Sequence, residues 1–137
     1  HITENIKMTL FTSGDWIVDE NRDTTISVFN FMCETFPIIK GNEIEVNQVD
    51  LTDDNAYGFC QVDEDGEFLI HIHNDLSRDD YMVTLIHELV HVKQTLTGLK
   101  DHNRREEEAV IWEKILFHRL KQKLGELVPL DFLSPKR

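Results

Sequence analysis

The sequence predicts an α+β fold, with one domain spanning residues 1–137 and a core at about residues 24–124. Three segments repeat their apolar side chains at helical spacing, and three shorter segments between the first two of them alternate as strands do. Since 40% of the residues are hydrophobic and 29% are charged, the chain can build a single hydrophobic core. We therefore expect an N-terminal helix, a three-stranded antiparallel sheet and two further helices.

The three expected helices have recognisable ends. The first runs over residues 23–36, where apolar side chains lie three and four residues apart and a proline follows. The second begins after Ser77, whose spacing from Asp80 resembles a capping box, and ends at Gly98. The third covers about residues 103–124, where a stripe of alanine and leucine marks the buried face.

Three strands are expected at residues 43–50, 57–62 and 67–73, and a turn-forming Asp-Glu-Asp-Gly run separates the last two. In the third strand one face carries only apolar side chains and is expected to face the core, whereas the other face is mixed. Residues 6–11 and 16–18 carry a weaker extended pattern. Because the three strands follow one another closely, we expect them to pair antiparallel.

The acidic composition argues against several classes of partner. The formal net charge is -12, so phosphate backbones would be repelled and nucleic-acid binding is not expected. The basic cluster Lys114–Lys123 is interleaved with apolar residues, as on a solvated helix face. No segment has the roughly 20 apolar residues that a membrane span needs. We therefore expect no membrane contact, a cytoplasmic location and a monomer.

The N-terminus and the cysteines add two smaller expectations. The N-terminus lacks the basic and apolar run of a secretory signal, and His1 is interpreted as the remnant of an expression tag. Cys33 and Cys60 lie far apart, without Cys-x-x-Cys spacing. We therefore expect two buried free thiols rather than a disulfide or a metal cluster.

The run His87-Glu88-Leu89-Val90-His91 is the motif that carries chemistry. It lies within the second expected helix, where a spacing of four residues places both imidazoles on one face, about one turn apart. That separation suits one tetrahedral zinc ion. The carboxylate of Glu88 could then act as the general base, because zinc lowers the pKa of its bound water to about 7.

A catalytic zinc needs a third protein ligand and an open position for water. The third expected helix opens with three adjacent glutamates, and Glu106 lies three residues before Ala109 on the apolar stripe, so it is the expected ligand. Glu108 faces another side of the helix, and Glu107 is expected to be the most solvated. Both remain alternatives, together with His102 in the preceding loop.

Other side chains could assist the reaction. We assign to His102 the role of donating a hydrogen bond to the oxyanion of the tetrahedral intermediate, with Tyr57, Tyr81 and His118 as weaker candidates. Glu113 falls within the apolar stripe of the third expected helix. It is interpreted either as the partner of a ligand histidine or as a member of a surface salt bridge.

His71 and His73 form a second pair of histidines on one face of the third expected strand. Such a pair binds metal in other contexts. Since the helical motif already supplies two ligands, we expect these two histidines to face solvent or to line the cleft.

The run HELVH followed by REEEA resembles the zincin metallopeptidases of the gluzincin branch, especially small minigluzincin-like proteins of phages and bacteria. In those families a helix bearing Glu-x-x-Ala or Glu-x-x-x-Asp follows HExxH, and its first glutamate completes the site. The resemblance covers about residues 24–124 and implies a minimal zincin-like domain with the same order of elements. It implies His87, His91 and Glu106 as ligands of one zinc ion, and Glu88 as the base of a protease.

Two consequences of this resemblance stay open. In gluzincins the last strand before the active-site helix commonly forms the cleft edge, which implies that residues 67–73 pair with an extended peptide substrate. An SprT-like pattern, with His102 as the downstream ligand, is an alternative to Glu106.

The competing function is a binding or regulatory module that keeps zinc for stability or recognition and has no turnover.

Overall fold

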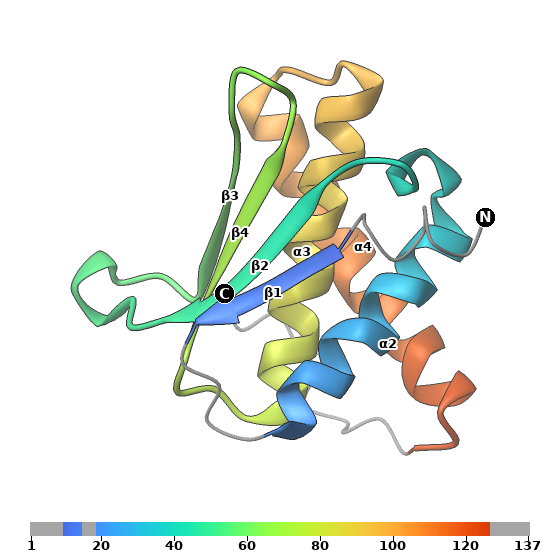
Figure 1. Ribbon diagram of the computed structural model, residues 1–137. Helices are drawn as coiled ribbons and strands as arrows, with labels where there is room; N and C mark the ends of the chain where they lie inside the picture. The colour runs from blue at the N-terminus through green and yellow to red at the C-terminus, as the bar shows by residue number, and fades with distance from the viewer. Residues whose placement is uncertain (1–9, 15–18, 127–137) are drawn as a thin grey trace, which may run out of the picture.

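The computed structural model describes residues 10–14 and 19–126, and it places three α-helices on one face of a mixed sheet (Figure 1). The helices are α2 (Asp19–Thr35), α3 (Arg78–Thr97) and α4 (His102–Lys123), and the strands are β1 (Leu10–Gly14), β2 (Ile44–Val49), β3 (Gly58–Val62) and β4 (Phe68–His73). Two short 3-10 helices are η1 (Pro37–Ile39) and η2 (Thr52–Asp54). The expected α+β class is confirmed. None of the helices in these ranges combines the length and the apolar content that crossing a bilayer requires.

The sheet is mixed, so the expectation of an antiparallel sheet was wrong. Its order is β1-β2-β4-β3, in which β2 pairs parallel with β1 and β4, and only β3 and β4 pair antiparallel. The expectation assumed that consecutive strands are neighbours. Instead, the connection at residues 50–57 carries β3 past the position that β4 later fills. After two reversals of direction, β4 lies beside β2 and runs parallel to it.

The N-terminal part of the fold is a crossover between parallel strands. Helix α2 connects β1 to β2, and β1 adds a fourth strand to the three that were expected. Residues 6–9 and 16–18 of the weak extended pattern lie outside the described residues. Helix α2 begins at Asp19 rather than Asp23 and ends at Thr35.

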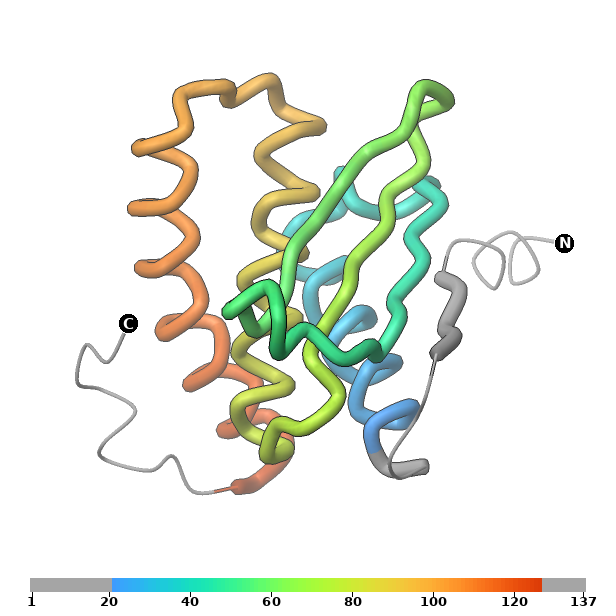
Figure 2. The backbone as a smooth tube through the Cα atoms, turned by 90° about the vertical axis from the view of Figure 1, so that its left-hand side faces the viewer, coloured from blue at the N-terminus to red at the C-terminus, as the bar shows by residue number. Residues whose placement is uncertain are grey.

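Helix α3 lies between the sheet and α4, with α2 beside it (Figure 2). The side chain of Ser77 accepts a hydrogen bond from the backbone N–H of Asp80 at 3.2 Å, which confirms the expected cap. The helix ends before Gly98, whose φ of 84° is a left-handed conformation that favours glycine. Because neighbours surround α3, side chains on most of its faces are buried, among them Leu85 and Leu89.

Helix α4 runs back along α3 after a short turn (Figure 2). The Asp101 side chain caps its start, and the expected stripe is buried at Ala109, Leu116 and Leu120, whereas Leu124, just after the helix, is exposed. Near its end, the Lys121 ammonium lies 2.9 Å from the carboxylates of both Asp79 and Glu126. Contacts at both ends therefore fix how α4 lies on α3.

The two faces of the sheet differ as expected. On β4 the apolar face is buried under the helices, and it consists of Phe68, Ile70 and Ile72. The side chains on the opposite face are half-buried, and they are Leu69, His71 and His73. Within the described ranges, no helix covers that outer face (Figure 2).

Amide hydrogen exchange would distinguish the observed strand order from the expected one. Strand β4 lies between β2 and β3, and its end residues bond to both sides: Phe68 N–H to Glu43 O, and His73 N–H to Tyr57 O. We expect all amides of β4 to exchange slowly, and alternate amides of β3 to exchange fast, because in the described chain β3 pairs only with β4. Uniform protection of β3 with alternating protection of β4 would contradict this order.

Candidate metal centre

Two imidazole rings of α3 and one carboxylate of α4 converge in the candidate site. His87 and His91 lie one helical turn apart, with their Nε2 atoms 3.1 Å from each other and their ring planes at 83°. Glu106 places Oε1 3.4 Å from Nε2 of His87, and Oε2 2.8 Å from Nε2 of His91. The structure thus brings together the three side chains that the helix pattern had selected.

The spacing and the chemistry of this group fit a tetrahedral zinc ion. With Zn–N and Zn–O distances of about 2.0–2.1 Å, two ligand atoms of a tetrahedron lie about 3.3 Å apart. Here the two Nε2 atoms are 3.1 Å apart, and the nearest oxygen of Glu106 lies 3.4 Å from that of His87 and 2.8 Å from that of His91. Two histidines and one glutamate are also a ligand set of catalytic zinc sites, which leave the fourth position to water.

Glu113 orients the first histidine. Its carboxylate is only 3% exposed and lies 2.7 Å from Nδ1 of His87. Because a carboxylate only accepts, Nδ1 donates, and the Nε2 lone pair of the neutral ring is directed at the site. Burial lowers the pKa of His87, but the hydrogen bond to Glu113 and the nearby carboxylates outweigh it and raise the pKa. The alternative of a surface salt bridge was wrong, because Glu113 is buried.

A buried amide contacts the second histidine. Nδ1 of His91 lies 2.8 Å from Oε1 of Gln94, whose side chain is 0% exposed. The amide nitrogen of Gln94 donates to the backbone oxygen of Arg105 and to the carboxylate of Glu108, each at 3.0 Å. Burial, with a contribution from the charge of His87, lowers the pKa of His91. Gln94, which lies one turn after His91, was not among the predicted site residues.

The three rival ligands have other surroundings. Glu108 accepts the hydrogen bond from Gln94 and lies 3.7 Å from Nζ of Lys93. Glu107 is exposed, and so is His102, the first residue of α4. Among the described residues, none of these three belongs to the group of converging ligand atoms. Helix phase therefore selected the glutamate that faces the two histidines.

A cavity of about 290 Å³ opens onto the three converging side chains. Glu88, which is only 5% exposed, lines it together with both histidines of the motif. The remaining lining comes from β3 and from the start of α4: Gly58, Phe59, Cys60, His102 and Arg105. The expected base and the three expected ligands thus share one space.

Gly58 allows β3 to lie against α3 at this cavity. A Cβ at position 58 would lie 2.8 Å from Cγ2 of Thr84 and 2.9 Å from the backbone oxygen of His71, and 3.5 Å from Oε2 of Glu88. The first two distances are too short for carbon contacts, so a side chain here would displace β3 from Glu88. Gly58 could not be predicted from the sequence, because it is crowded only when β3 is packed between the backbone of β4 and the side chains of α3.

Cys60 and Arg105 also line the cavity, and no local pattern singled them out. Burial, and then the charge of Glu88, raise the pKa of the Cys60 thiol to about 12, so the thiol stays protonated at neutral pH. Both cysteines are free, as expected, but only Cys33 is buried, and Cys60 is half-buried. Arg105 donates to the backbone oxygen of Leu99 at 2.8 Å and to Oγ1 of Thr95 at 3.2 Å. It thereby holds the start of α4 against the end of α3.

The four candidates for stabilising an oxyanion differ in whether they line the cavity. His102 lines the cavity, whereas Tyr57, Tyr81 and His118 are not part of its lining. The Tyr81 hydroxyl is buried and hydrogen-bonded to Oγ1 of Thr25 on α2. His102 is therefore the candidate whose position suits the role.

His71 and His73 lie on the outer face of the sheet. The ring of His71 packs on Phe59, with centroids 4.8 Å apart, and its Nε2 lies 3.4 Å from Nδ2 of Asn47. Nδ1 of His73 accepts the backbone N–H of Leu51 at 3.0 Å. In the described ranges, neither histidine joins a group that could hold a metal ion.

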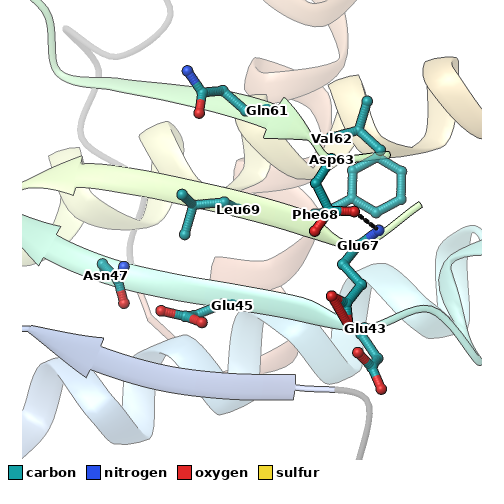
Figure 3. Close-up of a pocket in the computed structure, with 9 residues that line it drawn as sticks. All are labelled: Glu43, Glu45, Asn47, Gln61, Val62, Asp63, Glu67, Phe68 and Leu69. Carbon is teal, nitrogen blue, oxygen red and sulfur yellow. Dashed lines mark hydrogen bonds between the residues drawn. The ribbon is translucent and has the colours of Figure 1, made fainter. Parts of the chain in front are cut away.

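A larger cavity of about 840 Å³ lies on the outer face of the sheet, and acidic side chains including Glu43 and Glu45 line it (Figure 3). Asp63 and Glu67 of this lining form, with Asp65, a second group that could surround a cation. All three are exposed, and Oδ1 of Asp63 already accepts the backbone N–H groups of the other two at 2.9 Å. This group is a hydrogen-bonded turn and a weaker metal candidate than the histidine site.

Comparisons with known proteins give no family assignment. No family model, curated protein or solved structure matches the chain. The function must therefore be inferred from the geometry and chemistry of the site.

The pair Glu43 and Glu67 should make stability depend on pH. Their hydrogen bond and charge repulsion raise the pKa of Glu67 from 4.5 to about 7. The folded state holds this proton more tightly, so its contribution is present below pH 4.5 and is lost as the pH rises through about 7. Between about pH 5 and pH 8, we expect Glu43→Gln to lose less stability than the wild type, measured by urea denaturation. Glu45→Gln is the matched control, and equal pH dependence in Glu43→Gln and the wild type would refute the coupling.

Proposed function

We propose that the protein is a zinc-dependent metallopeptidase, with one Zn²⁺ held by His87, His91 and Glu106. The observation that carries this proposal is the convergence of two imidazole nitrogens, 3.1 Å apart, and the Glu106 carboxylate, whose nearest oxygens lie 3.4 and 2.8 Å from them, beside the buried carboxylate of Glu88 in one cavity. The resemblance of HELVH and REEEA to the gluzincin pattern supports the same reaction. The substrate class is a peptide or a protein.

Each group at the site has a step to perform. Zinc in such a site supplies Lewis-acid chemistry, which lowers the pKa of water to about 7 and polarises a carbonyl. The Glu88 carboxylate takes the proton of the attacking water and then gives it to the leaving amine. His102, on the cavity wall, donates a hydrogen bond to the oxygen of the tetrahedral intermediate. Glu113 keeps the imidazole of His87 oriented throughout.

The substrate is expected to bind at the edge of β3. The earlier expectation for residues 67–73 was wrong, because β4 pairs on both sides and cannot accept another strand. Over the part of the chain that is described, β3 pairs only with β4, so its second edge can pair with an extended peptide. Gly58, Phe59 and Cys60 of this strand line the cavity beside Glu88. A peptide on this edge would therefore run past the proposed base.

Replacing Glu88 by glutamine tests the proposed chemistry. We expect turnover to fall roughly 10²- to 10⁴-fold, because the general base is lost. Zinc content should stay at one ion per chain, because Glu88 does not belong to the converging group. The measurements are hydrolysis of a fluorogenic peptide library and elemental analysis of the purified variant. Function that persists in Glu88→Gln would instead favour a zinc-containing binding or regulatory module.

A further inference from the structure

Gln94 connects two parts of the candidate metal centre. Its side chain is 0% exposed near the end of α3. Its oxygen lies 2.8 Å from Nδ1 of His91, and its nitrogen lies 3.0 Å from both the backbone oxygen of Arg105 and the carboxylate of Glu108. Arg105 directly precedes Glu106 in the chain. One amide therefore contacts the second proposed ligand and the turn that carries the third.

The partners of this amide fix its orientation. A backbone oxygen and a carboxylate both accept hydrogen bonds and cannot donate them, so both must face the NH2 end of Gln94. The oxygen end then faces His91, and an amide oxygen also only accepts. Nδ1 of His91 must therefore carry the hydrogen, which leaves the lone pair on Nε2 when the ring is neutral. Glu108 therefore influences the tautomer of His91 indirectly, because it fixes which end of the Gln94 amide faces the ring.

The two histidines are thus oriented by different chemistry. The Glu113 carboxylate can only accept from His87, so it needs no further group to fix the tautomer. An amide could present either end to His91, and the wrong end would favour the tautomer whose Nε2 cannot bind a metal. The carboxylate of Glu108 and the backbone oxygen of Arg105 both accept from the amide nitrogen, so only the amide oxygen can face His91.

We propose that Gln94, oriented by Glu108, is a positioning residue of the zinc site. It selects the Nδ1–H tautomer of His91 and holds the turn that carries Glu106 against α3. The proposal rests on the proposed zinc site, and it does not depend on peptidase activity. It also gives Glu108 a function in zinc binding, although this residue is not among the converging ligands.

Replacing Gln94 by methionine distinguishes a residue that orients His91 from one that only fills space between the helices. Methionine has a similar length and removes both hydrogen-bonding ends, so much of the packing is kept. We expect the Kd for zinc to rise roughly 10- to 100-fold, measured by competition with a chelator. Circular dichroism on the same sample confirms that the variant is folded. If Gln94 only packs, the melting temperature falls while the zinc Kd of the folded variant stays at the wild-type value.

A change at Glu108 tests the same chain of contacts, which runs from Glu108 through Gln94 to His91. Its side chain is 33% exposed, so variants at this position should fold. Glu108→Lys puts a donor where the amide needs an acceptor, which should turn the Gln94 oxygen away from His91 and weaken zinc binding. Glu107→Lys makes the same charge change at the exposed neighbouring position, and it should weaken binding less. Glu108→Gln keeps an acceptor oxygen and should bind zinc like the wild type.

Long-range ¹H–¹⁵N NMR of the zinc-free protein reads the tautomer directly, in a Glu106→Ala background that removes the competing acceptor 2.8 Å from Nε2 of His91. In that background we expect the Nδ1–H form of His91 with Gln94 and Glu108 intact and with Glu108→Gln, and loss of that preference with Gln94→Met and Glu108→Lys. If both of the latter variants keep the wild-type tautomer and zinc Kd, this inference is overturned while the zinc site stands. If the wild type binds no zinc, the proposed function fails, and the tautomer spectra still decide whether Gln94 orients His91.

Discussion

The candidate site depends on the contact between the start of α4 and the end of α3. A helix with the HExxH pattern supplies two imidazoles, so the third ligand must come from another element. Ala109, which is 0% exposed, lets the two helices approach closely, and Arg105 fastens the first turn of α4 to Leu99 and Thr95. Glu106 consequently lies within 3.4 Å of both histidines. A change that separated these helices would remove one corner of the site without altering a histidine.

The surroundings of this contact hold several buried polar groups. Glu88, Glu113 and Gln94 are 5%, 3% and 0% exposed. Burying carboxylates costs free energy unless charges or hydrogen bonds compensate for the lost hydration. A divalent cation among two imidazoles and the nearby carboxylates would provide such compensation. The arrangement is therefore better suited to binding a metal than to maximal stability of the metal-free fold.

Local patterns predicted the helices and much of the site, because these features depend on spacing along a single helix. The Ser77 cap, the facing pair of imidazoles and the phase of Glu106 all follow from helical periodicity. The strand order could not be predicted in this way, because it depends on where the connection at residues 50–57 carries β3. Gly58 and Gln94 were missed for a related reason. Their roles exist only once β3 and α4 are packed against α3.

The roles proposed for Glu88, for His102 and for the edge of β3 all depend on the proposal that a metal ion binds between α3 and α4. X-ray absorption at the zinc edge of the zinc-loaded protein tests that claim most directly. We predict a first shell of nitrogen and oxygen at about 2.0–2.1 Å, with imidazole scattering from two histidines and a change in the oxygen shell in Glu106→Gln. A sulfur neighbour at about 2.3 Å, which would implicate Cys60, or a shell without imidazole would contradict it.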